Sequence, residues 1–138
     1  MSLPGATYRI QFHLNFRFRD AEEPVPYLHA LVITHLYASP RFRARKGSLH
    51  GYDVADAAQV NSELGTEEEF QSLVKRLHSY EMGLLLDIVP NHMAASEENP
   101  WWMDVLENGQ QSEFWRHFRT AISTSPSLPM ISMPTPCV

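Results

Sequence analysis

Residues 84–92 read LLLDIVPNH, the most informative stretch of this sequence. Its first six residues are apolar except for Asp87, a pattern typical of a parallel strand that is buried on both faces. Pro90 ends the strand because proline has no backbone N–H to donate to a neighbouring strand. In parallel α/β sheets, binding residues gather where strands end. We therefore expect a site that includes Asp87, Asn91 and His92, although a strand running out into a polar turn would leave the same pattern.

A helix is predicted immediately before this strand. Thr66 and Glu69 have the spacing of a capping box, and Gly83 lies where a helix C-terminus favours glycine. The apolar residues between them recur at helical spacing: Phe70, Leu73, Val74 and Leu77. A second helix is predicted from residue 99, with an asparagine as its N-cap and a proline as its first residue.

The N-terminal part adds two strands and one helix. Residues 7–14 alternate between apolar and polar side chains, and residues 33–37 form a second short apolar segment, so both predict strands. Between them Asp20 opens a helix whose two prolines fit only in the first turn. Its expected buried stripe has three members: Tyr27, Leu28 and Leu31. Residues 41–65 are expected to form a long polar loop.

The predicted order is therefore β-α-β, long loop, α-β, loop and α. Strands that alternate with helices predict a parallel sheet with right-handed crossovers. A doubly wound sheet and a barrel are both compatible with this order. The chain has 138 residues, which is one compact domain but is short of the ~250 residues of a complete eight-stranded βα barrel.

The composition excludes several classes of protein. The chain is 43% hydrophobic and 20% charged with a net charge of −5, which is typical of a globular protein and argues against nucleic acid as a partner. The single cysteine, Cys137, cannot form an internal disulfide. Neither a leader pattern nor an apolar run of membrane-spanning length is present. We expect a cytoplasmic protein without a membrane partner, and the oligomeric state is left open.

A second candidate site lies in the predicted loop, where residues 50–53 read HGYD. Gly51 lets the backbone approach a neighbouring segment closely, and Tyr52 offers a flat ring with one polar tip, suited to the apolar face of a sugar. A loop that is simply anchored by its tyrosine would look the same. The seven histidines are scattered along the chain without the spacing of metal ligands, so no metal site is predicted.

These motifs resemble those of glycoside hydrolase family 13, the α-amylase superfamily. Residues 87–92 resemble the superfamily's first motif, at the end of its third barrel strand, and Tyr52 with Asp53 resemble its Gly-Tyr-Asp segment after strand two. Within the superfamily, the series from about residue 6 to residue 117 is similar to the maltooligosyltrehalose synthase family. The matching stretches are ATYRIQ at 6–11, THLYASP at 34–40, HGYDV at 50–54, VNSELG at 60–65 and NPWWMDVLE at 99–107.

The resemblance implies an α/β fold, in which residues 1–118 are the N-terminal part, about three βα units, of an incomplete TIM (β/α)8 barrel. The implied substrate is a maltooligosaccharide or another α-1,4-glucan, whose reducing-end linkage is isomerised from α-1,4 to α-1,1. The implied chemistry uses a carboxylate nucleophile, a covalent glucosyl-enzyme intermediate and a carboxylic acid that protonates the leaving oxygen.

The resemblance also implies roles for individual residues. The implied substrate-binding residues are Tyr52, His92 and Asp53. Tyr52 stacks under the cleaved sugar, and His92 forms hydrogen bonds with the hydroxyl groups of that sugar. Asp87, His50 and Asn91 support the site, and Asp87 is expected to pair with an arginine on the fourth strand. The position of Asn91 binds calcium in many amylases but is not expected to do so in these synthases. No metal and no cofactor are therefore predicted.

The chain departs from the family pattern in two main respects. The nucleophile, the general acid and the third carboxylate belong to strands four, five and seven of the family, so the chain is expected to be an inactive fragment that folds poorly. Residues 119–138, which contain no charge after Arg119, are expected to be unrelated to the family, as a frame-shifted or naturally disordered tail. The alternative functions are another α-amylase-superfamily enzyme, such as a glucanotransferase or hydrolase, and a small sugar-binding protein without catalysis.

Overall fold

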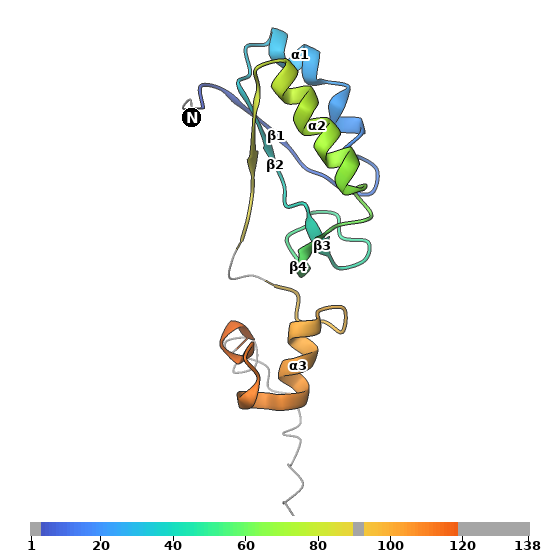
Figure 1. Ribbon diagram of the computed structural model, residues 1–138, viewed down its shortest axis with the longest axis vertical. Coiled ribbons are helices and arrows are strands. Elements are labelled where there is room, and N and C mark those ends of the chain that lie inside the picture. Colours follow the sequence, from blue (N-terminus) through green and yellow to red (C-terminus); the bar gives the residue numbers. More distant parts are fainter. Residues whose placement is uncertain (1–3, 90–92, 119–138) are drawn as a thin grey trace, which may run out of the picture.

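A parallel three-stranded sheet lies at the centre of the computed structural model, which describes residues 4–89 and 93–118 (Figure 1). Its strands are β1 (Thr7–Ile10), β2 (His35–Ala38) and β5 (Gly83–Leu86), and their order is β1-β2-β5. Helix α1 (Val25–Ala30) follows β1, and helix α2 (Glu67–Ser79) precedes β5. The two helices lie together against one face of the sheet. The predicted parallel sheet is therefore confirmed.

The main core fills the space between the sheet and the two helices. Alternate strand residues Ile10, Leu36 and Ala38 point into it and are buried, as the twofold alternation of a strand requires. Helix α2 contributes Phe70, Leu73 and Leu77, all of them buried. Three phenylalanines interlock edge to face, with ring centroids 5.0 Å apart for Phe12–Phe18 and 5.2 Å for Phe18–Phe70.

Helix α2 begins as the sequence predicts and ends differently. The side chain of Thr66 accepts a hydrogen bond from the Glu69 N–H at 3.2 Å, and the Glu69 carboxylate accepts from the Thr66 N–H at 3.0 Å, which completes the capping box. The predicted role of Gly83 as a helix terminator is wrong, because Gly83 is the first residue of β5. A Cβ atom at Gly83 would collide with the His35 ring, so this glycine makes room for the side chain of its partner on β2.

The segment between β1 and β2 departs from the predictions in three ways. The strand ends at Ile10, because the chain turns back on itself through paired hydrogen bonds between His13 and Phe16. The helical stretch begins with the 3-10 turn η1 (Asp20–Glu22) before α1. The predicted stripe is correct for Leu28 but wrong for Tyr27 and Leu31, which are 65% and 51% exposed. The residues that face the core instead are Ala21, Val25 and Leu28.

The predicted loop over residues 41–65 contains an antiparallel hairpin, which the sequence analysis missed. Its strands are β3 (Phe42–Ala44) and β4 (Val54–Val60), and their register shifts twice within three residue pairs. Charged residues and register shifts hide the alternation by which such strands are predicted. The hairpin matters for the site because it closes the loop that carries Tyr52.

A second, smaller core lies around α3 (Pro100–Asn108), which is followed by the 3-10 turn η2 (Gly109–Gln111). The predicted N-cap is confirmed, since the Asn99 side chain accepts a hydrogen bond from the Trp101 N–H at 3.0 Å. Trp102, Val105 and Phe118 form this core. Within the described residues, no helix has the length and apolar character needed to cross a membrane.

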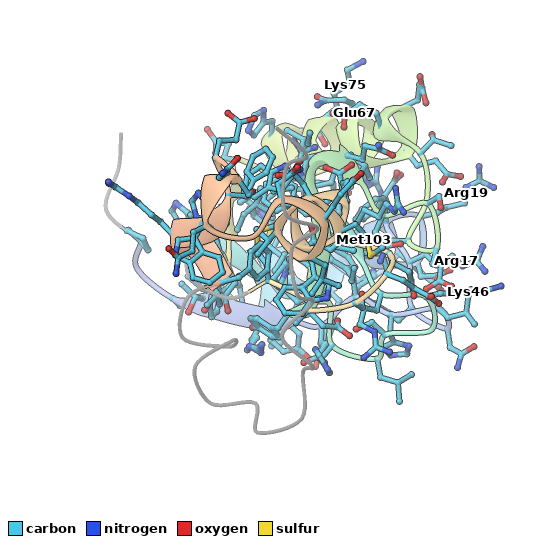
Figure 2. All side chains as sticks on the ribbon, turned by 90° about the horizontal axis from the view of Figure 1, so that it is seen from below. Arg17, Arg19, Lys46, Glu67, Lys75 and Met103 are labelled. Carbon is cyan, nitrogen blue, oxygen red and sulfur yellow. The ribbon has the colours of Figure 1, made fainter. Side chains whose placement is uncertain are left out.

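Charged side chains extend outward from the surface of the molecule (Figure 2). Arg17, Lys46 and Lys75 are examples, and all three are exposed. Arg19 pairs with Glu69 at 2.8 Å, but an exposed pair of this kind contributes only ~0.2–1 kcal/mol to stability. The apolar core, rather than surface ion pairs, therefore accounts for the fold.

The prediction that β5 and the residues after it are buried on both faces is wrong. Leu85, Ile88 and Val89 are 36%, 58% and 43% exposed. Strand β5 forms an edge of the sheet, and the described helices α1 and α2 cover only one of its faces. The opposite face is the one that carries the candidate site.

Candidate functional site

The strand register brings polar side chains together on the sheet face that the helices leave uncovered. Arg9 pairs with Tyr37 in the β1–β2 ladder, and Tyr37 pairs with Leu85 in the β2–β5 ladder. Asp87 lies two residues beyond Leu85, and its N–H donates to the Ala38 carbonyl at 2.8 Å, which continues the ladder. Because side chains two residues apart share a face, Asp87 lies beside Arg9 and Tyr37.

Tyr52 comes from the loop before β4 and closes this cluster. Its hydroxyl donates to the Asp87 carboxylate at 2.5 Å and accepts from the Arg9 guanidinium at 2.7 Å. The Arg9 guanidinium also lies 5.5 Å from the centre of the Tyr37 ring. Asp87 thus faces away from the helices and is hydrogen-bonded to Tyr52. We call Arg9, Tyr37, Tyr52 and Asp87 the strand-end cluster.

The electrostatics of the strand-end cluster favour an ionised Asp87. The hydrogen bond from Tyr52, then the nearby Tyr37 hydroxyl, and the charge of Arg9 lower the pKa of Asp87, while partial burial acts in the opposite direction. The same contact with Asp87 raises the pKa of Tyr52, against the lowering effect of Arg9. Arg9 has a raised pKa, chiefly through Tyr52. At neutral pH the cluster therefore holds one cation, one carboxylate and two neutral phenols.

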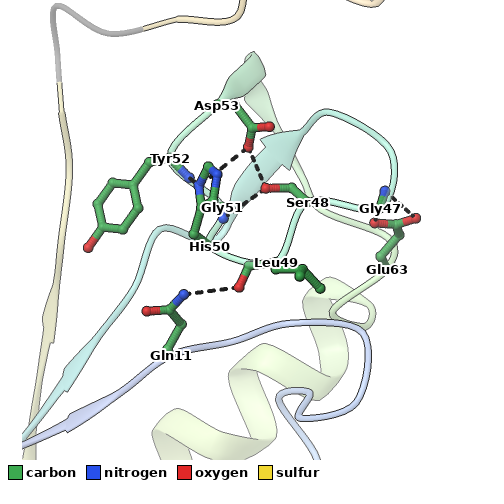
Figure 3. Close-up of polar contacts among 9 residues, drawn as sticks. All are labelled: Gln11, Gly47, Ser48, Leu49, His50, Gly51, Tyr52, Asp53 and Glu63. Atoms are coloured by element: carbon green, nitrogen blue, oxygen red, sulfur yellow. Dashed lines mark hydrogen bonds and ion pairs between the residues drawn. The ribbon is translucent and has the colours of Figure 1, made fainter.

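Several hydrogen bonds hold the loop that carries Tyr52 in place (Figure 3). The Ser48 hydroxyl donates to the Asp53 carboxylate and accepts from the Gly51 N–H at 3.1 Å. Gly51 has a φ of 75°, which favours glycine, and a Cβ there would lie 3.2 Å from the Pro40 carbonyl. The Gln11 amide also donates to the Leu49 carbonyl at 3.0 Å, which joins the loop to the chain after β1.

His50 and Asp53 lie in this loop and support its shape. The His50 Nδ1 accepts from the Tyr52 N–H at 3.1 Å and lies 3.7 Å from the Asp53 carboxylate. The rings of His50 and Tyr52 are stacked with centroids 6.1 Å apart. The support predicted for His50 therefore has a physical basis in the contact with Tyr52. The contacts of Asp53 hold the loop together, and its binding of a sugar stays a prediction.

Two predicted site residues, Asn91 and His92, lie outside the described residues, and their roles stay predictions. Among residues 4–89 and 93–118, no group of three or more histidine, cysteine, aspartate or glutamate residues is placed to hold a metal ion. The arginine that was expected beside Asp87 from a fourth strand stays a prediction, and in the described residues Arg9 of β1 reaches Asp87 through Tyr52.

The sequence analysis missed two residues of the cluster, Arg9 and Tyr37. A signal for Arg9 was present, because the alternation of the first strand places it on the polar face. The signal for Tyr37 was its position one residue before the end of β2. Joining these signals required the register between strands, which a single sequence does not contain.

Comparisons with known proteins identify relatives over most of the chain. The profile described as "Alpha amylase, catalytic domain" matches residues 21–133. A putative maltooligosyl trehalose synthase of Mycobacterium tuberculosis H37Rv is 42% identical over 120 residues, which covers 82% of this chain and 16% of that protein. The intracellular maltogenic amylase of Bacillus subtilis strain 168 is 35% identical over 100 residues, covering 71% of this chain and 16% of that protein.

Solved structures show the same relationship. The maltooligosyltrehalose synthase of Arthrobacter ramosus matches with a TM-score of 0.76 and 43% identity over 81% of this chain and 15% of its own. A trehalose-6-phosphate hydrolase of Bacillus licheniformis, at 21% identity and a TM-score of 0.67 over 80% of this chain and 21% of its own, shares the fold. These likenesses resolve the choice between a doubly wound sheet and a barrel: the fold is a partial TIM barrel.

The chain spans about 16% of the length of the curated relatives that it matches first. The profile match extends to residue 133, whereas residues 119–138 lie outside the described structure, so the expectation that they are unrelated to the family stays a prediction. The profile match over most of the chain, together with the parallel strands that carry the strand-end cluster, shows that this chain belongs to the α-amylase catalytic-domain family, glycoside hydrolase family 13.

Proposed function

We propose that this chain supplies one wall of the maltooligosaccharide site of a maltooligosyltrehalose synthase. The observation that carries the proposal is the bonded Arg9–Tyr52–Asp87 row at the carboxyl ends of parallel strands. Ligand sites of TIM barrels lie at this end of the strands. The match to the maltooligosyltrehalose synthase covers more of this chain than the matches to the maltogenic amylase and to a cyclomaltodextrinase of similar identity, which supports the choice among family members.

In this proposal Tyr52 is the platform on which a glucose unit stacks. Its hydroxyl is hydrogen-bonded to Arg9 and Asp87, so the tip of the ring is held in place. An aromatic face of this kind suits the apolar face of a pyranose, while its polar tip stays bonded to the protein. As the family resemblance implies, His92 would form hydrogen bonds with the hydroxyl groups of the same sugar, and Asp53 would also contribute to substrate binding.

The proposed reaction of the whole enzyme is isomerisation of the reducing-end α-1,4 linkage to α-1,1. A retaining mechanism needs two carboxyl groups ~5–5.5 Å apart, one as nucleophile and one as acid. Asp87 does not suit the role of acid, because its lowered pKa keeps the carboxylate ionised. It does not suit the role of nucleophile either, because its carboxylate accepts a hydrogen bond from the Tyr52 hydroxyl. We therefore propose that residues 1–138 by themselves bind the substrate but do not turn it over.

A binding experiment tests the sugar platform directly. The 138-residue chain is titrated with maltopentaose and, as the matched ligand control, with the β-1,4-linked cellopentaose, and binding is followed by NMR chemical shifts. We expect maltopentaose to bind and Tyr52→Ala to weaken binding about fivefold or more, the effect of losing one aromatic contact. Tyr27→Ala, which removes an exposed tyrosine from α1, is the control. Unchanged binding by Tyr52→Ala would contradict the platform role.

A second experiment tests the reaction class. Residues 6–118 replace the matching segment of the Arthrobacter ramosus enzyme, and the chimera is incubated with maltopentaose. We expect loss of reducing ends without net release of glucose, because an α-1,1 linkage consumes a reducing end while hydrolysis creates one. The isolated chain should leave the reducing ends unchanged. A folded chimera that only hydrolyses would favour a hydrolase as the source of this segment.

A further inference from the structure

We propose that Arg9 is a positioning residue that acts through the Tyr52 hydroxyl to fix the position of the sugar platform. The inference rests on the function proposed above. Arg9 lies on β1, 43 residues before Tyr52, and their side chains meet at 2.7 Å. Neither the profile match nor the motifs that identify the family single out this contact.

The contact with Arg9 sets the direction of both hydrogen bonds of the Tyr52 hydroxyl. A guanidinium can only donate, whereas a phenol has one proton and can also accept. The hydroxyl oxygen therefore accepts from Arg9, and its single proton remains for the Asp87 carboxylate at 2.5 Å. With a cation on one side and an anion on the other, the ring is held at its tip by two charge-assisted hydrogen bonds.

No other described side chain is placed to replace Arg9. Within residues 4–89 and 93–118, the close ion pairs of arginine and histidine involve carboxylates other than Asp87. Arg9 also lies over the Tyr37 ring at 5.5 Å, a geometry that suits the planar guanidinium. Arg9 thus orients both tyrosines of the strand-end cluster at once.

The first test compares Arg9→Met with Arg9→Lys and with Arg76→Met. Methionine keeps much of the apolar stem, and lysine keeps the charge without the planar fork. Arg76 lies 5.0 Å from the Tyr80 ring on the opposite side of the fold, so its loss is a matched control. We expect Arg9→Met to weaken maltopentaose binding about fivefold, the equivalent of one lost hydrogen bond. Arg9→Lys should recover part of the loss, and Arg76→Met should bind as the wild type does.

A double variant separates positioning from direct contact with the sugar. If Arg9 acts through the hydroxyl, then Arg9→Met has no further effect on binding once Tyr52→Phe has removed that hydroxyl. If the full loss persists in the Tyr52→Phe background, Arg9 binds the sugar itself and the proposal is overturned.

A measurement without sugar keeps the inference separate from the proposed function. In Arg9→Met, the pKa values of Asp87 and Tyr52, followed by NMR titration of labelled side chains, should both rise, because each anion loses a neighbouring cation. Arg9→Lys should give smaller rises, and it replaces the methionine variant if that variant fails to fold. Failure of the wild type to bind maltopentaose would overturn the proposed function, whereas unmoved pKa values would overturn the role of Arg9.

Discussion

The two faces of the β1-β2-β5 sheet are built from neighbouring residues and yet differ in burial and in polarity. On one face, Leu36 and its neighbours are buried under α1 and α2 in a close-packed apolar core. On the other face, the adjacent residue Tyr37 joins Arg9 and Asp87 in a half-open polar row. Because side chains alternate along a strand, one short segment serves both faces.

This difference indicates that the packed core and the candidate site are separated by one residue step along each strand. The helix-covered face contains interlocked phenylalanines and leucines, where loss of a few atoms leaves a cavity. The site face contains charged and hydroxyl groups bonded to one another near solvent. Substitutions on the first face should therefore change folding, and those on the second should change binding.

The largest expected effect is the difference in stability loss between two leucine-to-alanine substitutions, one on each face of the sheet. Leu73→Ala removes a fully buried side chain of α2 and should destabilise the fold by ~2–5 kcal/mol. Leu85→Ala, at a residue that is 36% exposed on the site face, should cost less than ~1 kcal/mol. Urea denaturation followed by circular dichroism measures both. Equal losses would contradict the separation of the two faces.

A smaller effect is expected at the start of α2. Thr66→Ala removes the side-chain acceptor of the capping box and should cost ~1 kcal/mol. Ser72→Ala, at an exposed position within the same helix, should change stability by no more than ~0.5 kcal/mol. The two midpoints of urea denaturation are compared, and binding of maltopentaose should be the same in both variants.

The smallest effect is the pH dependence that Asp87 contributes. Its folded-state pKa is lowered below the unfolded value of 3.8, so its stabilisation is present above pH 3.8 and is lost as the pH falls through the folded-state pKa. Solvent screening keeps the contribution small. The stability gap between the wild type and Asp87→Asn should narrow on acidification. Glu107→Gln, an exposed change on α3, is the control, and a gap that is constant with pH would contradict the depressed pKa.

The agreement between sequence and structure depends on how local each signal is. The capping box at Thr66, the N-cap at Asn99 and the apolar spacing of α2 involve residues within one or two turns, and all were predictable. The hairpin β3–β4 was not, because its pairing is irregular and its strands carry charges. The exposure of Tyr27 and Leu31 depends on which side of α1 meets the sheet, and that is a tertiary choice.

The candidate site divides in the same way. A carboxylate at the end of an apolar strand and a tyrosine after glycine are visible in the sequence, but a polar turn and an anchored loop explained them equally well. The family resemblance, rather than residue types and spacing alone, favoured Asp87 and Tyr52 as site residues. The row from Arg9 through Tyr52 to Asp87 joins three segments, 43 and 35 residues apart along the chain. The parallel register of β1, β2 and β5 brings Arg9 near Asp87, and the loop closed by the β3–β4 hairpin adds Tyr52. Neither step is visible in the sequence, because hydrogen bonds act over about 3 Å between residues that lie far apart along the chain.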